Sequence, residues 1–415
     1  AAAMDFFKDD KEMFDPASVK MQEVIVREGK KDDPKMTVLL EEAVNSYTKT
    51  YMAGNQALGR NLDANAMRNH FYRFPGVDND KDKTLSAMLR MAVIAQTQER
   101  YEKAPTETDE QRAEKAALEG LVKQLFVELK RDFKPSDLPP YTLVKLGVHL
   151  ANTSQPEESI AYFDEILDPS EPDPVRKKAR INGMSKYRKN AVFGKAVALG
   201  RSKDNAKVET AIKMMKDELS KEESSANPDR KAMEDAQYNL VKFTSARQDW
   251  PSVIAAADKY RENKSYKKNL PEVLYLQGEA YLKQNELDKA LINFMNITGT
   301  YKGLVKWSAP AVLAQMDTLW KRNTMSQGAG KQPSDRYIAW KAGSQYVQLL
   351  DTPANRKKMT AEDSALVNEV KDKTAKFGSD PAVSQERADI AAYEAAIRAA
   401  KGQKLSLIHI SGPRD

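Results

Sequence analysis

A glycine-rich loop is the first stretch whose residue types and spacing suggest chemistry. It contains Gly328, Gly330 and Lys331 in the sequence "QGAGKQ". A phosphate-binding P-loop needs a glycine five residues before its second glycine and a Ser or Thr directly after the lysine. This chain has Met325 and Gln332 at those positions. We therefore expect a solvated loop between two helices and no nucleotide site.

Alternating acidic residues form a second candidate, in the stretch "VDNDKDKTL". Asp78, Asp80 and Asp82 have the spacing of the first ligands of a calcium-binding loop. In that loop, a glycine at position six makes a sharp turn, and an acidic residue at position twelve binds the ion through both oxygens. Lys83 and Leu89 stand at those two positions. We therefore expect a charged turn before a helix.

Histidines are the remaining candidates for acid–base chemistry. Cysteine is absent, which excludes disulfides, thiolate metal sites and thiol nucleophiles. His409 belongs to a terminal stretch that resembles a translated sequencing adapter. His70 and His149 lie far apart, without an acidic or Ser partner in a recognisable motif, and we expect His149 to be a partly buried packing residue. We predict no catalytic residue, no cofactor and no metal, and therefore no enzymatic activity.

The composition predicts the class of elements that would position any site. Apolar residues make up 41% of the chain and charged residues 30%, as in a water-soluble protein with a core. Helix-forming residues dominate, while runs of Val, Ile and Thr are scarce, so a nearly all-helical protein is expected. Charges interrupt every hydrophobic stretch, which argues against a membrane span. The net charge of +6 is compatible with an acidic partner without requiring one.

The clearest structural pattern lies in "LYLQGEAYLKQNELDKALINF". Leu274, Gly278 and Tyr281 share one helical face, and after a polar turn Ala290 and Phe294 repeat that geometry. The small residues would let two helix backbones approach, while the aromatic rings fill the space beside the contact. This pattern resembles the tetratricopeptide repeat, in which a large residue, Gly and Tyr in the first helix precede Ala and Phe in the second.

Three further stretches repeat the pattern less strictly, as expected because a single hairpin cannot bury its outer faces. The glycine position recurs at Gly147, Gly194, Val241 and Gly278. The spacing exceeds the roughly 34 residues of the family. We assign the excess to polar linkers such as residues 168–190. The resemblance implies an all-α fold: a superhelical array of antiparallel helix pairs, or α-solenoid.

The patterns divide the chain into five segments. We predict an N-terminal segment at 1–33 with a signal remnant at 1–3, divergent helical repeats at 34–135, the repeat array at 136–300, degenerate repeats and a cap at 301–403, and a non-native tail at 404–415.

In the tetratricopeptide family, first helices line a concave face on which partners lie as peptides or helices. The resemblance places on that face Tyr141, Val144, Val148, Arg188, Lys195, Tyr238, Lys242, Tyr275 and Glu279. Aromatic residues alternating with cations suit an acidic or C-terminal peptide. The carboxylate clamp of chaperone-binding members is not supported, because Val144 and Val148 stand where Lys and Asn would. The alternative is that Tyr238 and Tyr275 only pack between repeats.

A basic run at residues 176–189 is the one feature that suggests nucleic acid. Its acidic neighbours and the small net charge favour a solvated helix face, so we expect a protein or peptide partner instead.

We therefore predict a non-catalytic scaffold or adaptor that uses Tyr141, Arg188, Lys195, Tyr238, Lys242, Tyr275 and Glu279 to bind its partner. A bacterial envelope complex, with a periplasmic or otherwise exported location, is expected from the signal-like Ala1–Ala3; a cytoplasmic location is the alternative. The alternative function is the binding portion of a larger enzyme or transport system. The oligomeric state stays open.

Overall fold

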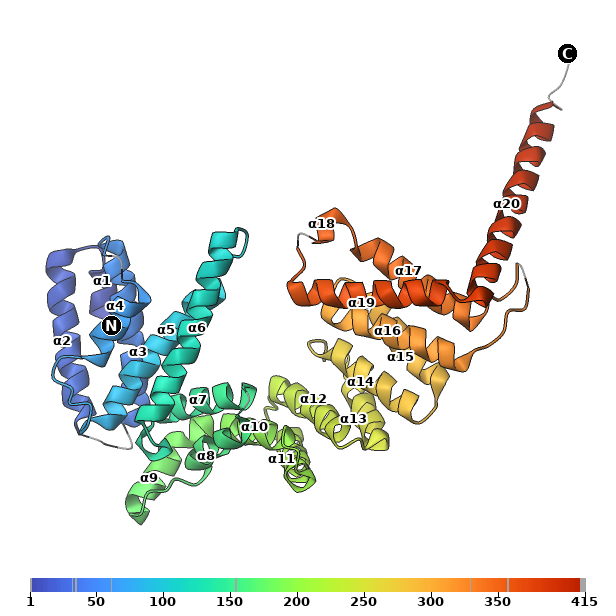
Figure 1. The fold of residues 1–415 in the computed structure, drawn as a ribbon. Coiled ribbons are helices and arrows are strands. Elements are labelled where there is room, and N and C mark those ends of the chain that lie inside the picture. Colours follow the sequence, from blue (N-terminus) through green and yellow to red (C-terminus); the bar gives the residue numbers. More distant parts are fainter. Residues whose placement is uncertain are drawn as a thin grey trace. The chain divides into compact units, whose positions relative to one another are not determined.

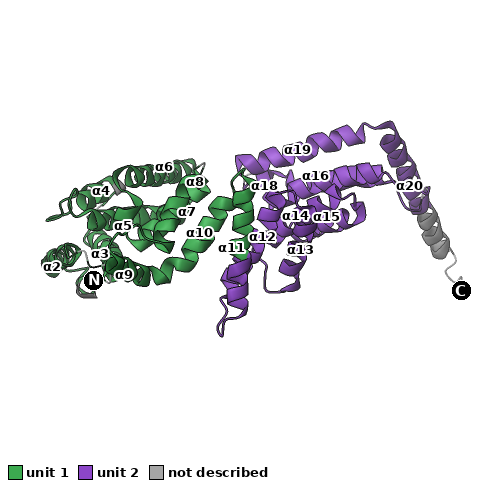
Figure 2. Cartoon of the chain, turned by 90° about the horizontal axis from the view of Figure 1, so that it is seen from below, with its two compact units in different colours: residues 1–215 green, residues 216–415 purple. Residues whose placement is uncertain are grey.

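The chain folds into helices in two compact units. The structure, a computed structural model, describes residues 2–31, 33, 36–60, 62–153, 155–328, 330–356 and 358–410. Every regular element in these residues is a helix, which confirms the all-α prediction. The two units are Ala1–Met215 and Lys216–Asp415, and helix α11 (Asn205–Glu223) spans their boundary (Figure 2).

The first unit runs from α1 to α10 (Figure 1). Its elements in chain order are α1 (Ala2–Phe6), α2 (Lys11–Gly29), α3 (Thr37–Ala57), α4 (Ala64–Tyr72), α5 (Lys83–Lys103), α6 (Asp109–Asp132), the 3-10 helix η1 (Pro135–Asp137), α7 (Pro140–Asn152), α8 (Pro156–Leu167), α9 (Pro174–Met184), the 3-10 helix η2 (Ser185–Tyr187) and α10 (Arg188–Gly200).

The second unit follows from α12 onward. Its elements are α12 (Arg230–Ala246), α13 (Trp250–Glu262), α14 (Leu270–Lys283), α15 (Leu287–Thr300), α16 (Val305–Arg322), α17 (Asp335–Leu350), α18 (Pro353–Arg356), α19 (Ala361–Gly378) and α20 (Pro381–Ile410).

Helices that are neighbours in the chain pack against each other, as in a helical repeat solenoid. The pairs α7–α8, α12–α13 and α14–α15 coincide with three of the four predicted hairpins. The pairs α5–α6 and α16–α17 also pack, within the two segments for which divergent or degenerate repeats were predicted. In unit 2, α12 contacts α14 and α14 contacts α16, so the first helices of successive pairs lie side by side.

One expected linker is largely helical. Residues 168–190 contain α9, which the polar sequence did not suggest. Pro174 occupies the first helical position, and the Asp173 carboxylate accepts hydrogen bonds from the N–H groups of Val175 and Arg176. Local capping and ion pairs to α8 therefore stabilise this helix. Its sequence is too polar to show the periodic apolar residues by which a helix is predicted.

Glycines bring neighbouring helices close together around buried phenylalanines. The Phe163 ring of α8 lies against Gly147 of α7 and also against Gly194 of α10. A Cβ atom at Gly147 would lie 2.8 Å from this ring, closer than carbon atoms pack. In α14, a Cβ atom at Gly278 would lie 2.6 Å from the ring of Phe294. The predicted packing of Phe294 beside Gly278 is therefore confirmed, and Phe163 packs in the same way in unit 1.

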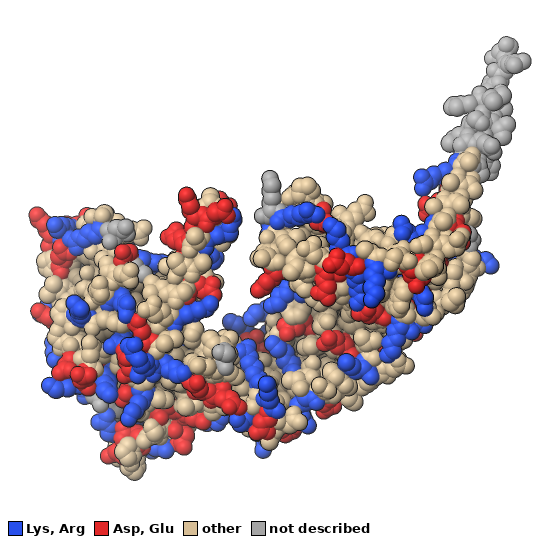
Figure 3. Space-filling view, in the orientation of Figure 1, with Lys and Arg blue, Asp and Glu red and all other residues tan. Residues whose placement is uncertain are grey.

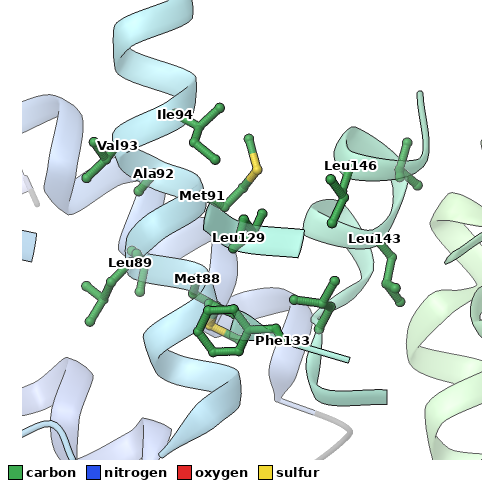
Figure 4. Packing of buried hydrophobic residues seen from close by; sticks show 14 of the residues in the cluster. Met88, Leu89, Met91, Ala92, Val93, Ile94, Leu129, Phe133, Leu143 and Leu146 are labelled. Carbon is green, nitrogen blue, oxygen red and sulfur yellow. The ribbon is translucent and has the colours of Figure 1, made fainter. Parts of the chain in front are cut away.

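Helix α5 forms the centre of unit 1. It contacts α2, α3, α4, α6 and α7, and so is buried on nearly every face between Leu85 and Ile94. Figure 4 shows its side chains gathered with Leu129 of α6 and with Leu143 and Leu146 of α7. This core holds the N-terminal helices and the first predicted repeat in one body.

Parts of two predictions fall outside the described residues. These are Ala1 of the signal-like segment and residues 411–415 of the predicted tail. Nothing is described of the His409 side chain either, although the helix of α20 continues through residues 404–410.

Substituting two helical glycines should distinguish the effect of close packing on stability from the effect of helix propensity. Gly194→Ala should lower the free energy of unfolding by about 1–3 kcal/mol, because the new methyl group meets the buried Phe163 ring. Gly120→Ala in α6, where a Cβ atom would have no neighbour within 4 Å, should raise it by about 0.5–1 kcal/mol. Urea unfolding followed by circular dichroism measures both. The same sign for the two variants would contradict the packing argument.

Candidate interaction surfaces

Two backbone hydrogen bonds connect the described residues of the glycine-rich loop. The N–H of Lys331 donates to the carbonyl of Gly328, and the N–H of Gln327 donates to the carbonyl of Gln332. Gly330 has φ +79° and lies against the ring of Tyr393 on α20. The loop therefore uses its glycines for a left-handed turn and for close packing.

The acidic stretch is also a turn. The Asp78 carboxylate accepts hydrogen bonds from the N–H groups of Asp80 and Lys81, and it pairs with the Lys81 ammonium at 3.2 Å. The hydrogen bond from Lys81 lowers the pKa of Asp78. Among the described residues, no group of three or more acidic or His side chains is placed to hold a metal ion.

Both histidines pack against aromatic rings. His149 stacks on Phe126 with a centroid distance of 4.0 Å, and His70 stacks on Tyr51 at 4.6 Å. Burial lowers the pKa of each imidazole. The expected packing role of His149 is therefore confirmed.

Acidic neighbours pair with most of the basic run. Arg180 contacts Glu165 at 3.3 Å, Lys177 contacts Asp168 at 2.8 Å, and Lys186 reaches Glu42 of α3 at 2.5 Å. Figure 3 shows blue and red side chains interspersed over the visible face of each unit. These cations thus serve contacts within unit 1.

In unit 2, two predicted binding residues meet around a carboxylate that the sequence did not single out. The Tyr238 hydroxyl donates to Glu272 at 2.5 Å, and the Lys242 ammonium lies 3.6 Å from the other oxygen of Glu272. The ammonium also lies 5.3 Å from the Tyr238 ring centroid. Because Glu272 belongs to α14, this cluster ties two neighbouring first helices together.

Tyr275 and Glu279 form a second pair one helical turn apart on α14. The Tyr275 ring packs on Phe294 with a centroid distance of 5.8 Å. Burial raises the pKa of Glu279, and burial together with this carboxylate raises the pKa of Tyr275. Both residues remain partly exposed, so packing and partner contact are compatible here.

We call the residues Asp235, Tyr238, Lys242, Glu272, Tyr275 and Glu279 the α12–α14 strip. Asp235 shares a face with Tyr238 and Lys242 because they are three and seven residues apart. Burial raises the pKa of its carboxyl group as well. The strip contains three carboxylates and one lysine, while Lys231 and Lys268 lie near Asp235 and Lys283 lies near Glu279. It therefore does not form the cationic surface expected for an acidic peptide.

In unit 1, the predicted residues Tyr141, Arg188 and Lys195 do not form one cluster. Lys195 pairs with Asp164 of α8 at 2.6 Å, and the Arg188 guanidinium donates to the carbonyl of Leu167 at 3.3 Å. The Lys145 ammonium lies over the Tyr141 ring, 5.4 Å from the ring centroid.

The two valines expected on the binding face of α7 differ in solvent exposure. Val144 was expected on the binding face but is only 7% exposed, because its position faces the helices that cover α7. Val148 is 40% exposed, as expected for that face.

A distant glutamate positions the start of α7. The buried Glu41 carboxylate on α3 accepts hydrogen bonds from the N–H groups of Tyr141 at 2.9 Å and Thr142 at 3.1 Å, and from the Thr142 hydroxyl at 2.9 Å. Pro140, the first residue of α7, has no N–H, so Glu41 satisfies the next two donors of this helix end. No sequence motif marks this cap, which joins residues a hundred positions apart.

Comparison with known protein families and curated proteins does not assign the chain to a family. No protein-family model and no curated protein matches the chain. The resemblance to tetratricopeptide repeats therefore stays a prediction from the residues quoted above. In the described part of the chain, no helix combines the length and apolar character of a membrane span.

Unit 1 should lose stability as Glu41 ionises. Burial raises the pKa of Glu41 from 4.5 to about 7. The folded state binds this proton more tightly than the unfolded state does. The resulting contribution to the free energy of unfolding is therefore complete below pH 4.5 and is lost as the pH rises through 7. The loss amounts to about 3 kcal/mol over this window. Urea unfolding at pH 5 and pH 8 measures it.

Glu41→Gln is the matched control for this titration. It keeps an oxygen acceptor for α7 and removes the charge, so its stability should change less than the wild type's between the two pH values. An identical pH dependence in both proteins would show that Glu41 does not titrate in this range.

Proposed function

We propose that this chain is a non-catalytic protein-binding scaffold whose first helices bind a peptide or helix of a partner protein. The observation that carries the proposal is the cluster of Tyr238, Lys242 and Glu272. Its side chains are partly exposed, yet hydrogen bonding and charge hold them in place across two helices. Aromatic and charged side chains that are ordered before binding lose little entropy when a partner arrives, which favours them as binding hot spots.

The charges suggest the chemistry of the partner. In unit 2, the α12–α14 strip has an excess of carboxylates beside two tyrosines, and both groups attract Lys and Arg side chains. A basic segment is thus the better match for unit 2. In unit 1, the corresponding positions carry Arg188 and Lys195, and a partner there would be acidic or neutral.

For the location, we propose a bacterial envelope complex outside the cytoplasm, because helical repeat arrays of this kind resemble periplasmic envelope-assembly factors. Fractionation of the source cells tests it. Recovery of the chain with cytoplasmic markers alone would argue against export.

Removing the cluster should strongly weaken partner capture. The tagged chain is cross-linked in the source cells, and the captured proteins are quantified by mass spectrometry. For the Tyr238→Ala/Lys242→Ala variant, we expect recovery of specific partners to fall by about tenfold or more, as for loss of a binding hot spot. Circular dichroism and the melting temperature show whether the variant is folded.

Ile292→Ala/Met295→Ala is the control for this experiment. Both side chains are more than half exposed on α15, a second helix, and truncating them should leave capture intact. Undiminished capture by the Tyr238/Lys242 variant, or equal loss in the control, would reject the first-helix surface as the binding site.

A further inference from the structure

A cleft in unit 2 is not part of the surfaces described above. It lies between α20, the first turns of α17 and the described loop residues 323–328 and 330–334, and has a volume of about 690 Å³. All of these elements belong to unit 2. In Figure 1, α20 extends away from the other helices of this unit.

The first half of α20 is firmly attached to α17. The Glu386 carboxylate accepts hydrogen bonds from the N–H of Ser334, at 2.8 Å, and from the Ser334 hydroxyl. The Arg387 guanidinium lies 4.1 Å from the Trp340 ring centroid, and Val383 is fully buried. These contacts fix the direction of α20 and therefore the width of the cleft.

Hydrogen bonds and an ion pair also fix the opposite wall of the cleft, formed by the loop and the start of α17. Asp335, at the start of α17, pairs with Arg322 at 2.6 Å and accepts a hydrogen bond from the N–H of Thr324. Gly330 lies against the Tyr393 ring of α20, where any side chain would collide. The loop and the helix thus form a preformed cleft.

An apolar stripe continues along α20 beyond this attachment. Ile390, Tyr393 and Ile397 follow one another at three and four residues, so they share one face of the helix. Tyr393 is 43% exposed and Ile397 38% exposed, while Met325 on the loop wall is 74% exposed. Exposed apolar side chains that line a cleft mark a binding surface more often than scattered ones do.

The charges around the cleft are of opposite sign on its two walls. Lys331 on the loop and Lys341 on α17 are exposed, and neither makes an ion pair with a described residue. On the other wall, α20 carries Asp389 and Glu394 beside its apolar stripe; Glu394 also pairs with Arg398 of the same helix at 3.3 Å. The best-matched occupant is an amphipathic helix whose apolar stripe is flanked by carboxylates that can reach the two lysines.

Helix α20 itself has this chemistry. We propose that the cleft binds α20 of a second copy of this chain, so that two molecules associate through a two-fold interface. Each α20 then serves both as the wall of one cleft and as the ligand of the other, as an isologous contact requires. Ile390, Tyr393 and Ile397 of the two helices pack together, and Asp389 and Glu394 of one molecule face Lys331 and Lys341 of the other.

The size of the stripe sets the strength of this contact. Residues 385–397 span about 18 Å of helix, enough for three turns of contact. Such a short seam of few large side chains predicts a reversible dimer whose fraction rises with concentration. This interface is independent of the first-helix surfaces, so its failure would leave the proposed function untouched.

Light scattering after size-exclusion chromatography tests the proposal directly. With rising concentration, the full chain should approach twice its monomer mass of 46.6 kDa. Ile397→Glu should return it to the monomer, because the new charge would be buried in the seam. Ala395→Glu, about 200° around the helix from Ile397, should still dimerise. A chain shortened to residue 403 should dimerise as well, since the contact does not use the tail.

Chemical cross-linking locates the contact. The chain has no cysteine, so Ile397→Cys introduces a single thiol, and a short bismaleimide joins two such thiols through thioether bonds. We expect a covalent dimer for Ile397→Cys and much less for Ala395→Cys. A wild type that is monomeric at every concentration, a dimer that persists in Ile397→Glu, or one that needs residues 404–415 would each overturn the proposal.

Discussion

The contact between a phenylalanine ring and a helical glycine is the interaction on which the helix arrangement depends. Phe163 fills the space between α7 and α10 only because neither Gly147 nor Gly194 has a side chain. One ring thus sets the distance between a helix and both of its neighbours, and Phe294 has the same role against Gly278 in unit 2. Because packed helices approach to within 8–10 Å, a single methyl group at such a contact is enough to separate them.

Buried polar contacts between distant residues complete this arrangement. Glu41 caps α7 from α3, Asp335 joins α16 to α17 through Arg322, and Glu386 attaches α20 to the start of α17. Each of these carboxylates satisfies backbone or guanidinium donors that would otherwise be buried without a partner. The apolar contacts therefore set the spacing of the helices, while these carboxylates determine which helix ends meet.

The same arrangement creates the two surfaces for which we propose partners. The α12–α14 strip presents tyrosines and carboxylates, of which a hydrogen bond holds Tyr238 and Glu272 in place; this suits the recognition of a partner peptide by charge and shape. The cleft beside α20 is apolar with charged edges, which suits a helix. In the function we propose, the chain would bind a partner along its first helices and a second copy through its last helix, on separate surfaces.

The amino-acid sequence by itself determined the helical class, the positions of three of the four repeat hairpins and the Gly–Phe contacts. These features depend on local periodicity and on residue size, which are visible in a single stretch of chain. Helix α9 escaped prediction because capping and ion pairs, rather than an apolar face, stabilise it. The partners of Tyr238 and Lys242, the cap of α7 by Glu41 and the cleft beside α20 were decided only by the tertiary structure. Each joins residues between about thirty and a hundred positions apart, and hydrogen bonds and ion pairs at that separation follow from how the helices pack and leave no periodic signal in the sequence.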